Sequence, residues 1–216
     1  MNDVKTIIFD YDGTIHHSLI IYEKAFKEAY QYLVKLGIAP VKHWHQDEIK
    51  KFLGQNPKEM WESFFLRLSD ETIQKASSII GLSMKEQIES GKAVLYDGAI
   101  ELLSYLKQKG YKLIYLSNSK RYYMDVNKNA FKLGQYFDLM ICSEDYNYLS
   151  KTEIIKKIRH EFIGEIVIIG DRIHDIEAGN KNNLYTIACD YGYGSSEELM
   201  TANIHIENIN QLYDIL

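Results

Sequence analysis

The chain has 216 residues and a formal net charge of -5, with 46% hydrophobic and 25% charged residues. That length suits one domain carrying a smaller insertion, and the composition is that of a globular protein with a buried core. The mild acidity argues against nucleic acid as an obligate partner, because duplex binders usually present a concentrated basic face. Since no apolar stretch approaches the roughly 20 residues of a membrane-spanning helix and no targeting segment is recognisable, we expect a cytoplasmic protein without a membrane partner.

Short apolar runs recur along the chain, each followed by a turn and then a helical pattern. They do not alternate apolar with polar residues, which is typical of parallel strands covered on both faces. Strands alternating with helices imply right-handed crossovers, so we predict an α/β fold with a doubly wound parallel sheet. The predicted strands are Lys5–Phe9, Lys112–Leu116, Leu139–Cys142, Glu165–Ile169, Tyr185–Cys189 and a weaker Ile204–Ile206.

The region between the first two strands has a different pattern. From about residue 16 to residue 92 it is helical, with an amphipathic stretch over Leu19–Leu36 and a further helix expected over Glu71–Glu89. An insertion placed just after a strand would lie over the ligand-binding edge of the sheet. We therefore predict a small all-helical cap domain, residues 16–92, inserted into a core made of residues 1–15 and 93–216.

Several helix ends carry sequence signals. Asn56 and Pro57 supply an N-cap and a first-turn proline ahead of four apolar residues, Met60, Trp61, Phe64 and Phe65. Gly110 is suited to the position that follows a helix over Ala99–Leu106.

A further helix start bears on function. Ser150 and Glu153 have the spacing of a capping box, which makes Lys151 the first residue of a helix.

The most informative segment is Asp10-Tyr11-Asp12-Gly13-Thr14, directly after the first strand. Parallel sheets bind ligands at the carboxyl ends of their strands, and two acids are expensive to bury there unless a cation or a reaction uses them. Polar residues follow three later strands in the same way, namely Ser117-Asn118-Ser119, Lys151 and Gly170-Asp171-Arg172-Ile173-His174-Asp175. All four points face the same edge of a parallel sheet, so we predict a functional site there.

These motifs, in this order, resemble those of the haloacid dehalogenase-like (HAD) hydrolases. The resemblance spans essentially the whole chain and is to the branch with a helical cap between the first and second motifs, which includes phosphoglycolate phosphatases. It implies a Rossmann-like core and a Mg²⁺-dependent phosphoric monoester hydrolase that acts on a small phosphorylated metabolite through an aspartyl phosphate.

The resemblance also implies a role for each motif residue. Asp10 would be the nucleophile, and Asp12 would be the general acid that protonates the leaving oxygen and then the base that activates water. Lys151 would neutralise negative charge. The residues expected to bind the phosphate are Gly13, Thr14, Ser117, Asn118 and Lys151.

The implied metal site is all oxygen, as Mg²⁺ prefers. Asp171 would bind the ion alongside Asp10 and the carbonyl oxygen of Asp12, and Asp175 would bind it directly or through water. An acid is usual in the family where this chain has His17, and neither His17 nor His16 receives a role.

Other functions stay open from the sequence. A phosphomutase like β-phosphoglucomutase, a pyrophosphatase or a nucleotidase would share the fold, whereas a phosphoacceptor receiver domain fits poorly because it lacks a helical insertion. We expect Gln55 to lie on a cap loop facing the active site. Lys120 and Arg121 are equally compatible with substrate contact and with a solvated helix start. A monomer or weak homodimer is expected.

Overall fold

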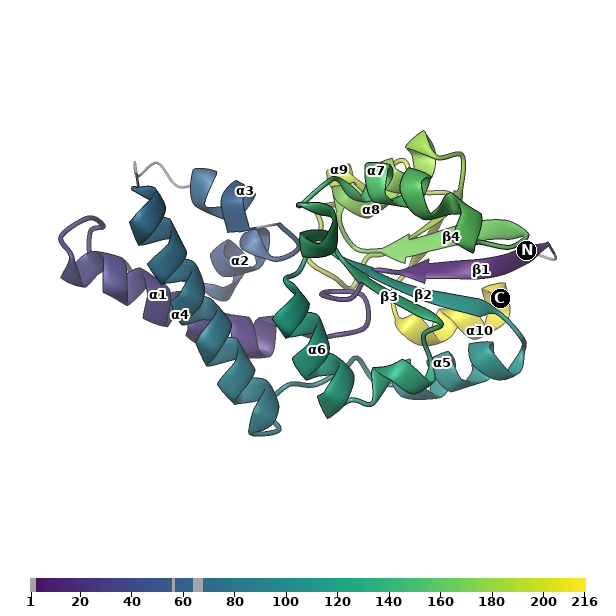
Figure 1. Ribbon diagram of the computed structural model, residues 1–216, viewed down its shortest axis with the longest axis horizontal. Helices are drawn as coiled ribbons and strands as arrows, with labels where there is room; N and C mark the ends of the chain where they lie inside the picture. Colours follow the sequence, from purple (N-terminus) through teal and green to yellow (C-terminus); the bar gives the residue numbers. More distant parts are fainter. Residues whose placement is uncertain (1–2, 56, 64–67) are drawn as a thin grey trace.

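The computed structural model describes residues 3–55, 57–63 and 68–216, and its centre is a six-stranded parallel sheet (Figure 1). The strand order is β3-β2-β1-β4-β5-β6, so the chain starts in the middle of the sheet and winds outwards in both directions. The strands are β1 (Val4–Phe9), β2 (Lys112–Ser117), β3 (Leu139–Cys142), β4 (Glu165–Gly170), β5 (Tyr185–Cys189) and β6 (Ile204–Ile206). Every predicted strand is present within one residue at each end, and the predicted doubly wound sheet is confirmed.

Helices cover both faces of the sheet, which explains why the strands lack alternation. In β1 every residue except Lys5 is buried. Ile8, on one face, packs with Ile154 and Ile155, whereas Ile7, on the other face, joins the cluster that contains Leu102. The helices of the core are α5 (Ala99–Gln108), α6 (Arg121–Ala130), α7 (Lys151–Ile158), α8 (Ile173–Lys181), α9 (Ser196–Leu199) and α10 (Leu212–Ile215).

The predicted helical cap follows β1 and lies beyond the carboxyl ends of the strands (Figure 1). Its long helices α1 (Leu19–Lys35) and α4 (Asp70–Glu89) pack against each other, and α4 also contacts α6 of the core. The shorter cap helices are α2 (Gln46–Ile49) and α3 (Pro57–Glu62). The helices expected at 19–36 and 71–89 are thus confirmed within one residue, whereas the exact domain boundaries at residues 16 and 92 stay a prediction.

Several of the helix-end signals can be compared with the structure. Pro57 is the first residue of α3 and Lys151 is the first of α7, where Ser150 Oγ accepts a hydrogen bond from the Glu153 amide at 3.3 Å. Gly110 follows α5 with φ of 86°, a left-handed conformation that glycine adopts without strain. The predicted N-cap residue, Asn56, lies outside the described residues, as do the apolar residues at positions 64 and 65.

Short 3-10 turns complete the chain: η1 (Lys50–Phe52), η2 (Leu133–Gln135), η3 (Ser143–Tyr146), η4 (Arg159–Glu161) and η5 (Ile209–Gln211). Both cysteines are free thiols buried at the ends of strands.

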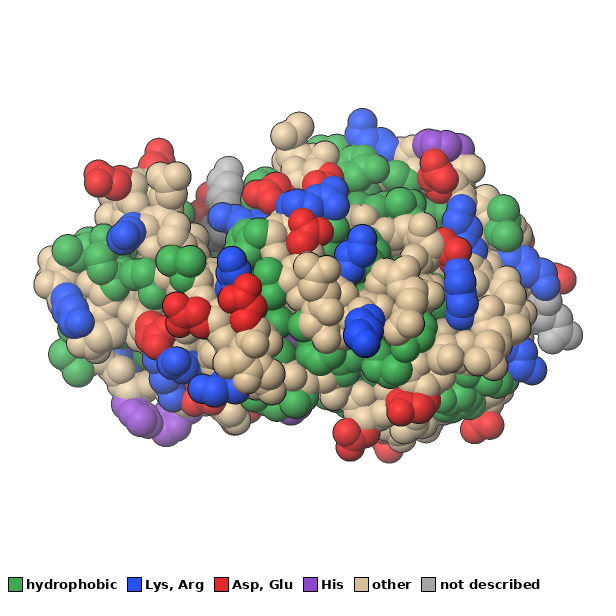
Figure 2. Space-filling view, turned by 60° about the horizontal axis from the view of Figure 1, so that its bottom comes forward, with side chains coloured by type: hydrophobic (Ala, Val, Ile, Leu, Met, Phe, Trp, Pro, Cys, Tyr) green, Lys and Arg blue, Asp and Glu red, His purple; other side chains and the backbone are tan. Residues whose placement is uncertain are grey.

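Among the described helices, none combines the length and the apolar character that crossing a bilayer requires. Acidic and basic side chains are interspersed on the face shown in Figure 2, where neither sign dominates.

Candidate active site

The site is built at the end of β1, where the strand passes into a tight turn. The Asp10 amide donates to the Ile169 carbonyl at 2.9 Å, which continues the ladder between β1 and β4 and fixes Asp10 at the sheet edge. The next residue, Tyr11, is fully buried, and its carbonyl accepts from the amides of Ile15 and His16, each at 2.9 Å. This turn directs Asp10 and Asp12 into different surroundings.

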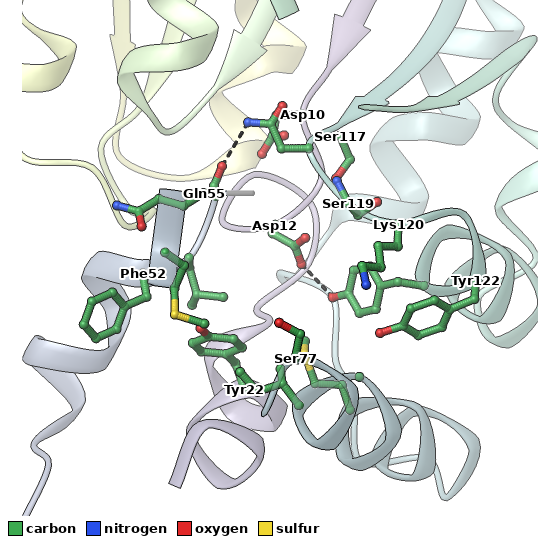
Figure 3. Close-up of a pocket in the computed structure, with 18 residues that line it drawn as sticks. Asp10, Asp12, Tyr22, Phe52, Gln55, Ser77, Ser117, Ser119, Lys120 and Tyr122 are labelled. Atoms are coloured by element: carbon green, nitrogen blue, oxygen red, sulfur yellow. Dashed lines mark hydrogen bonds between the residues drawn. The ribbon is translucent and has the colours of Figure 1, made fainter. Parts of the chain in front are cut away.

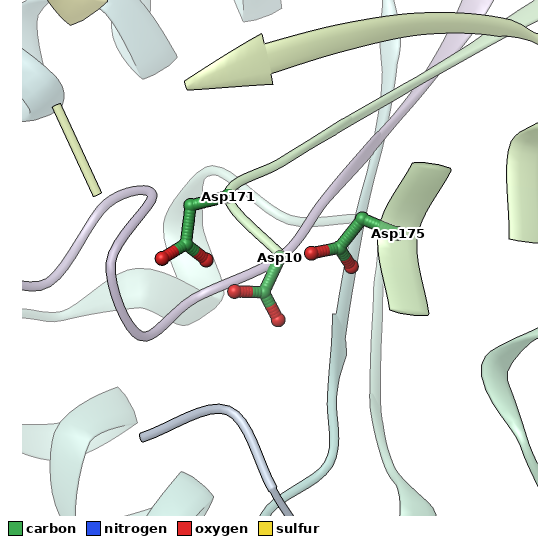
Figure 4. Close-up of side chains that lie close together, drawn as sticks. All are labelled: Asp10, Asp171 and Asp175. Atoms are coloured by element: carbon green, nitrogen blue, oxygen red, sulfur yellow. The ribbon is translucent and has the colours of Figure 1, made fainter. Parts of the chain in front are cut away.

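Asp10 lies in a buried cluster with two other aspartates. One oxygen each of Asp10, Asp171 and Asp175 lies within 4.8 Å of the others (Figure 4). The Lys151 ammonium donates to Asp10 Oδ1 and, at 2.6 Å, to Asp175 Oδ1. Four residues that follow three different strands therefore meet at one point of the sheet edge, as the sequence predicted.

The cluster holds more negative charge than its lysine can balance. Burial, opposed by Lys151 and reinforced by Asp175, raises the pKa of Asp10 to about 7. Burial followed by the charges of Asp10 and Asp175 raises the pKa of Asp171 well above its usual range. Burial alone would lower the pKa of Lys151, but the neighbouring carboxylates of Asp10 and Asp175 outweigh this effect and raise it. A cation bound between these carboxylates would offset the excess negative charge and favour their ionised forms.

The donor set fits a hard divalent cation such as Mg²⁺. All three side chains offer carboxylate oxygens, and Asp171 Oδ1 is buried with no hydrogen-bond partner among the described residues. Its other oxygen accepts from the Tyr193 amide at 2.7 Å, which orients the carboxylate. A Cβ on Gly13, whose φ is 87°, would lie 2.0 Å from Asp171 Oδ2, so glycine is what lets the first turn approach this carboxylate.

Asp12 is absent from this cluster and faces a cavity instead (Figure 3). Its Oδ1 accepts a hydrogen bond from the Tyr123 hydroxyl at 2.7 Å and lies 3.2 Å from His16 Nδ1. His16 is fully buried and stacks on Tyr11, and no partner for its Nε2 is present in the described part of the chain. Sequence reasoning assigned no role to His16 and did not find Tyr123, because no motif marks either residue.

The predicted phosphate-binding residues are only partly brought together. Ser117 and Asn118 line the cavity beside Asp10, and Ser117 Oγ accepts from the Ser119 amide at 3.2 Å. The Asn118 side chain donates to the Gly54 carbonyl at 3.0 Å, so it links the core to the cap loop. Thr14 is fully buried and is not among the described residues that line the cavity.

The cavity has a volume of about 130 Å³ and lies between the sheet edge and the cap. Gln55 lines it, as predicted for a cap loop facing the site, and Gln55 Oε1 is buried without a hydrogen-bond partner in the described residues. Lys120 also lines the cavity, whereas Arg121 pairs with Asp145, its Nε donating to Oδ1 at 3.0 Å. The cap loop is further held by the Arg172 guanidinium, which donates to the Leu53 carbonyl.

Known proteins resemble this chain in sequence or in fold. The model of the family described as haloacid dehalogenase-like hydrolase matches residues 7–189. A phosphoglycolate phosphatase of Aquifex aeolicus is 26% identical, with 88% of this chain and 86% of that protein covered. Pyrophosphatase PpaX of Bacillus mycoides is 20% identical, with coverages of 87% and 84%. A haloacid dehalogenase-like family hydrolase from Streptococcus pneumoniae superposes with a TM-score of 0.81 at 23% identity, covering 100% of this chain and 99% of that one.

Proposed function

Because the chain belongs to the haloacid dehalogenase-like hydrolases, we propose that it is a Mg²⁺-dependent phosphatase that transfers the phosphoryl group of a small phosphate monoester to Asp10. The match to the family confirms the resemblance inferred from the motifs and the assignment as an enzyme, with phosphatases among its relatives. The observation that carries the proposal is the buried Asp10 carboxylate, which contacts Lys151 and lies among two further acids.

Asp10 and Asp12 have environments suited to different roles. Asp10 Oδ1 is held by the Lys151 ammonium, which offsets the repulsion between a carboxylate and an incoming phosphate. A bond would form between Asp10 and phosphorus as the ester bond breaks, and Asp12 would give its proton to the departing oxygen. In the second step Asp12 would take a proton from water as the water attacks phosphorus, which releases inorganic phosphate and regenerates the Asp10 carboxylate.

The remaining residues would position the phosphate. Asp171, Asp175 and Asp10 would hold Mg²⁺, which supplies positive charge to the phosphate oxygens when bound. Ser117 lines the cavity beside Asp10 (Figure 3) and would donate its hydroxyl proton to a phosphoryl oxygen. The Asn118 backbone amide is proposed to act beside it, because its side chain is engaged with the cap loop.

Hydrolysis of a phosphoanhydride is the second candidate. It is favoured by the relatives named pyrophosphatase PpaX, which match most of this chain at about a fifth identity. The reacting residues would be the same, and the leaving group would be a phosphate rather than an alcohol. The two activities are separated by comparing the hydrolysis of monoesters with that of inorganic pyrophosphate.

The proposal is tested by the turnover of p-nitrophenyl phosphate with Mg²⁺ and with EDTA. We expect turnover that requires the metal and is lost in Asp10→Asn. Asp190→Asn is a matched control, because Asp190 also follows a strand but is exposed and pairs with His205 outside the cluster. Activity in Asp10→Asn comparable to that of the Asp190→Asn control would overturn the covalent mechanism.

A further inference from the structure

The cavity above the catalytic residues has two chemically different ends. At the core end lie Asp10, Asp12 and Ser117. The large side chains at the cap end come from α1, α3, α4, the last residue of η1 and the residue that follows it. We call these six residues the apolar wall: Tyr22, Phe52, Leu53, Met60, Ile80 and Met84. Figure 3 shows Tyr22 and Phe52 on the side of the cavity opposite Ser117. A substrate with its phosphate at Asp10 would direct its leaving group towards this wall.

The charged side chains that line the cavity, as far as the structure describes them, all belong to the core. Among the described residues that line it, the cap supplies no acidic or basic side chain, and the single cation besides the catalytic machinery is Lys120. Lys120 precedes α6 and so belongs to the core, not to the apolar wall. A carboxylate or second phosphate directed at the wall would lose its hydration against apolar carbon, which is an unfavourable transfer for a charge without a partner there. An apolar group would gain from the same burial.

The side chains of the apolar wall are held in place by packing against the rest of the cap. Tyr22, Met60 and Met84 are each less than 9% exposed. In α4, a Cβ on Gly81 would lie 2.1 Å from the Tyr122 hydroxyl, so this glycine allows the Tyr122 ring of the core to close one side of the cavity. Methionine side chains adapt to the shape of an apolar ligand, which suits a specificity wall.

The side chain of Gln55, a neutral polar group, indicates one further property of the leaving group. Gln55 lines the cavity, and its side-chain Oε1 is buried with no hydrogen-bond partner in the described part of the chain. A buried acceptor of this kind is unfavourable until a donor reaches it. A hydroxyl or amide N–H on the leaving group would supply that donor without adding negative charge.

We propose that the substrate is a phosphate monoester whose leaving group is compact, uncharged and predominantly apolar, such as an aromatic or branched aliphatic alcohol. This rests on the proposed phosphatase function and names the substrate class of the same site. It distinguishes the chain from enzymes acting on phosphoglycolate or pyrophosphate, whose leaving groups carry negative charge.

The test compares kcat/KM of the wild-type protein, in Mg²⁺, for benzyl phosphate, ethyl phosphate, phosphoglycolate and pyrophosphate. Benzyl and ethyl phosphate are both esters of primary alcohols, so their ratio reports mainly on the apolar body. We expect benzyl phosphate to exceed ethyl phosphate and phosphoglycolate at least about tenfold, the usual scale of discrimination by an apolar pocket. Phosphoglycolate or pyrophosphate equal to or better than benzyl phosphate would overturn the substrate class. No hydrolysis of any of them would instead refute the phosphatase function.

A variant of the wall gives an independent readout. Met84→Gln keeps the length of the side chain but adds an amide, and we expect it to reduce the ratio of benzyl to ethyl phosphate about tenfold. Leu82→Gln is the matched control, because Leu82 is on the same helix but is 62% exposed. An unchanged ratio in folded Met84→Gln would contradict the proposal. The wild-type comparison needs no variant, so it decides the question even if Met84→Gln does not fold.

Discussion

The buried cluster predicts an unusual effect of pH on the stability of the metal-free protein. The pKa of Asp10 is raised from 3.8 to about 7, mainly by burial, and this difference corresponds to about 4 kcal/mol. A carboxyl group whose pKa is higher in the folded state binds its proton more tightly there than in the unfolded chain. Its contribution to stability is therefore fully present below pH 4 and is lost as the pH rises to about 7.

Replacing Asp10 by asparagine removes this titration and leaves Lys151 paired with Asp175. At pH 8 and without metal, we expect Asp10→Asn to be more stable than wild type by up to about 4 kcal/mol. At roughly 2–4 °C per kcal/mol for a protein of this size, the midpoint of thermal unfolding would rise by about 10 °C. The difference should shrink steadily towards pH 4, where both forms of residue 10 are neutral.

The assay is denaturant unfolding in EDTA between pH 4 and pH 8, followed by titration with Mg²⁺. Metal binding favours the ionised carboxylate, so Mg²⁺ should stabilise wild type at pH 8 more than it stabilises Asp10→Asn. Asp190→Asn controls for the loss of an exposed acid. Parallel pH profiles for wild type and Asp10→Asn, or a wild type that is more stable at pH 8, would refute the electrostatic reasoning.

Two further predictions concern residues next to the proposed catalytic and metal-binding aspartates. Tyr123→Phe removes the hydroxyl that donates to Asp12. As Asp12 gives its proton to the leaving oxygen, this bond becomes a hydrogen bond to a charged group, which contributes about 1.5–3 kcal/mol. The value of kcat/KM, which reports on the first step alone, should therefore fall at least about tenfold for ethyl phosphate. It should fall less for p-nitrophenyl phosphate, whose leaving group needs no proton. An equal loss for both esters would argue against a role through Asp12. Gly13→Ala places a Cβ 2.0 Å from Asp171 Oδ2 at a residue with positive φ. Calorimetry should therefore show weakened Mg²⁺ binding, and denaturant unfolding should show a free energy of unfolding lower by at least about 2 kcal/mol. Gly37→Ala, also at positive φ but facing open space, should lose only about 1 kcal/mol and keep its metal affinity.

The sheet and the long helices were predictable because their patterns are local. In β1 the residues on both faces are buried, so the run of apolar residues identifies the strand without its neighbours. The capping box at Ser150 fixed the start of α7 and thereby placed Lys151, whose ammonium then reaches Asp10. Convergence at the sheet edge follows from strand direction alone, which is why the charged cluster could be predicted without coordinates.

The apolar wall could not be predicted in the same way. Its residues come from four separate elements of the cap, and whether Met84 or Leu82 faces the cavity depends on how α4 is rotated against α1. Periodicity shows that a helix has an apolar side, but part of that side covers the cap's own core and part covers the substrate. Only the packed structure separates the two.

The surroundings of Asp12 depend on hydrogen bonds between two segments that are far apart in the sequence, the turn after β1 and helix α6. Tyr11 donates its hydroxyl proton to Asn127 Oδ1 at 2.9 Å, and Asp12 accepts from Tyr123 at 2.7 Å. Tyr123 and Asn127 lie four residues apart on α6, where the Asn127 amide also donates to the Tyr123 carbonyl at 2.9 Å. Two consecutive residues of the first motif are therefore attached to consecutive turns of one helix, and this helix also contacts the cap through α4. A shift of α6 would move the hydroxyl that donates to Asp12, so a movement of the cap passed on through α4 would change the orientation of the proposed general acid.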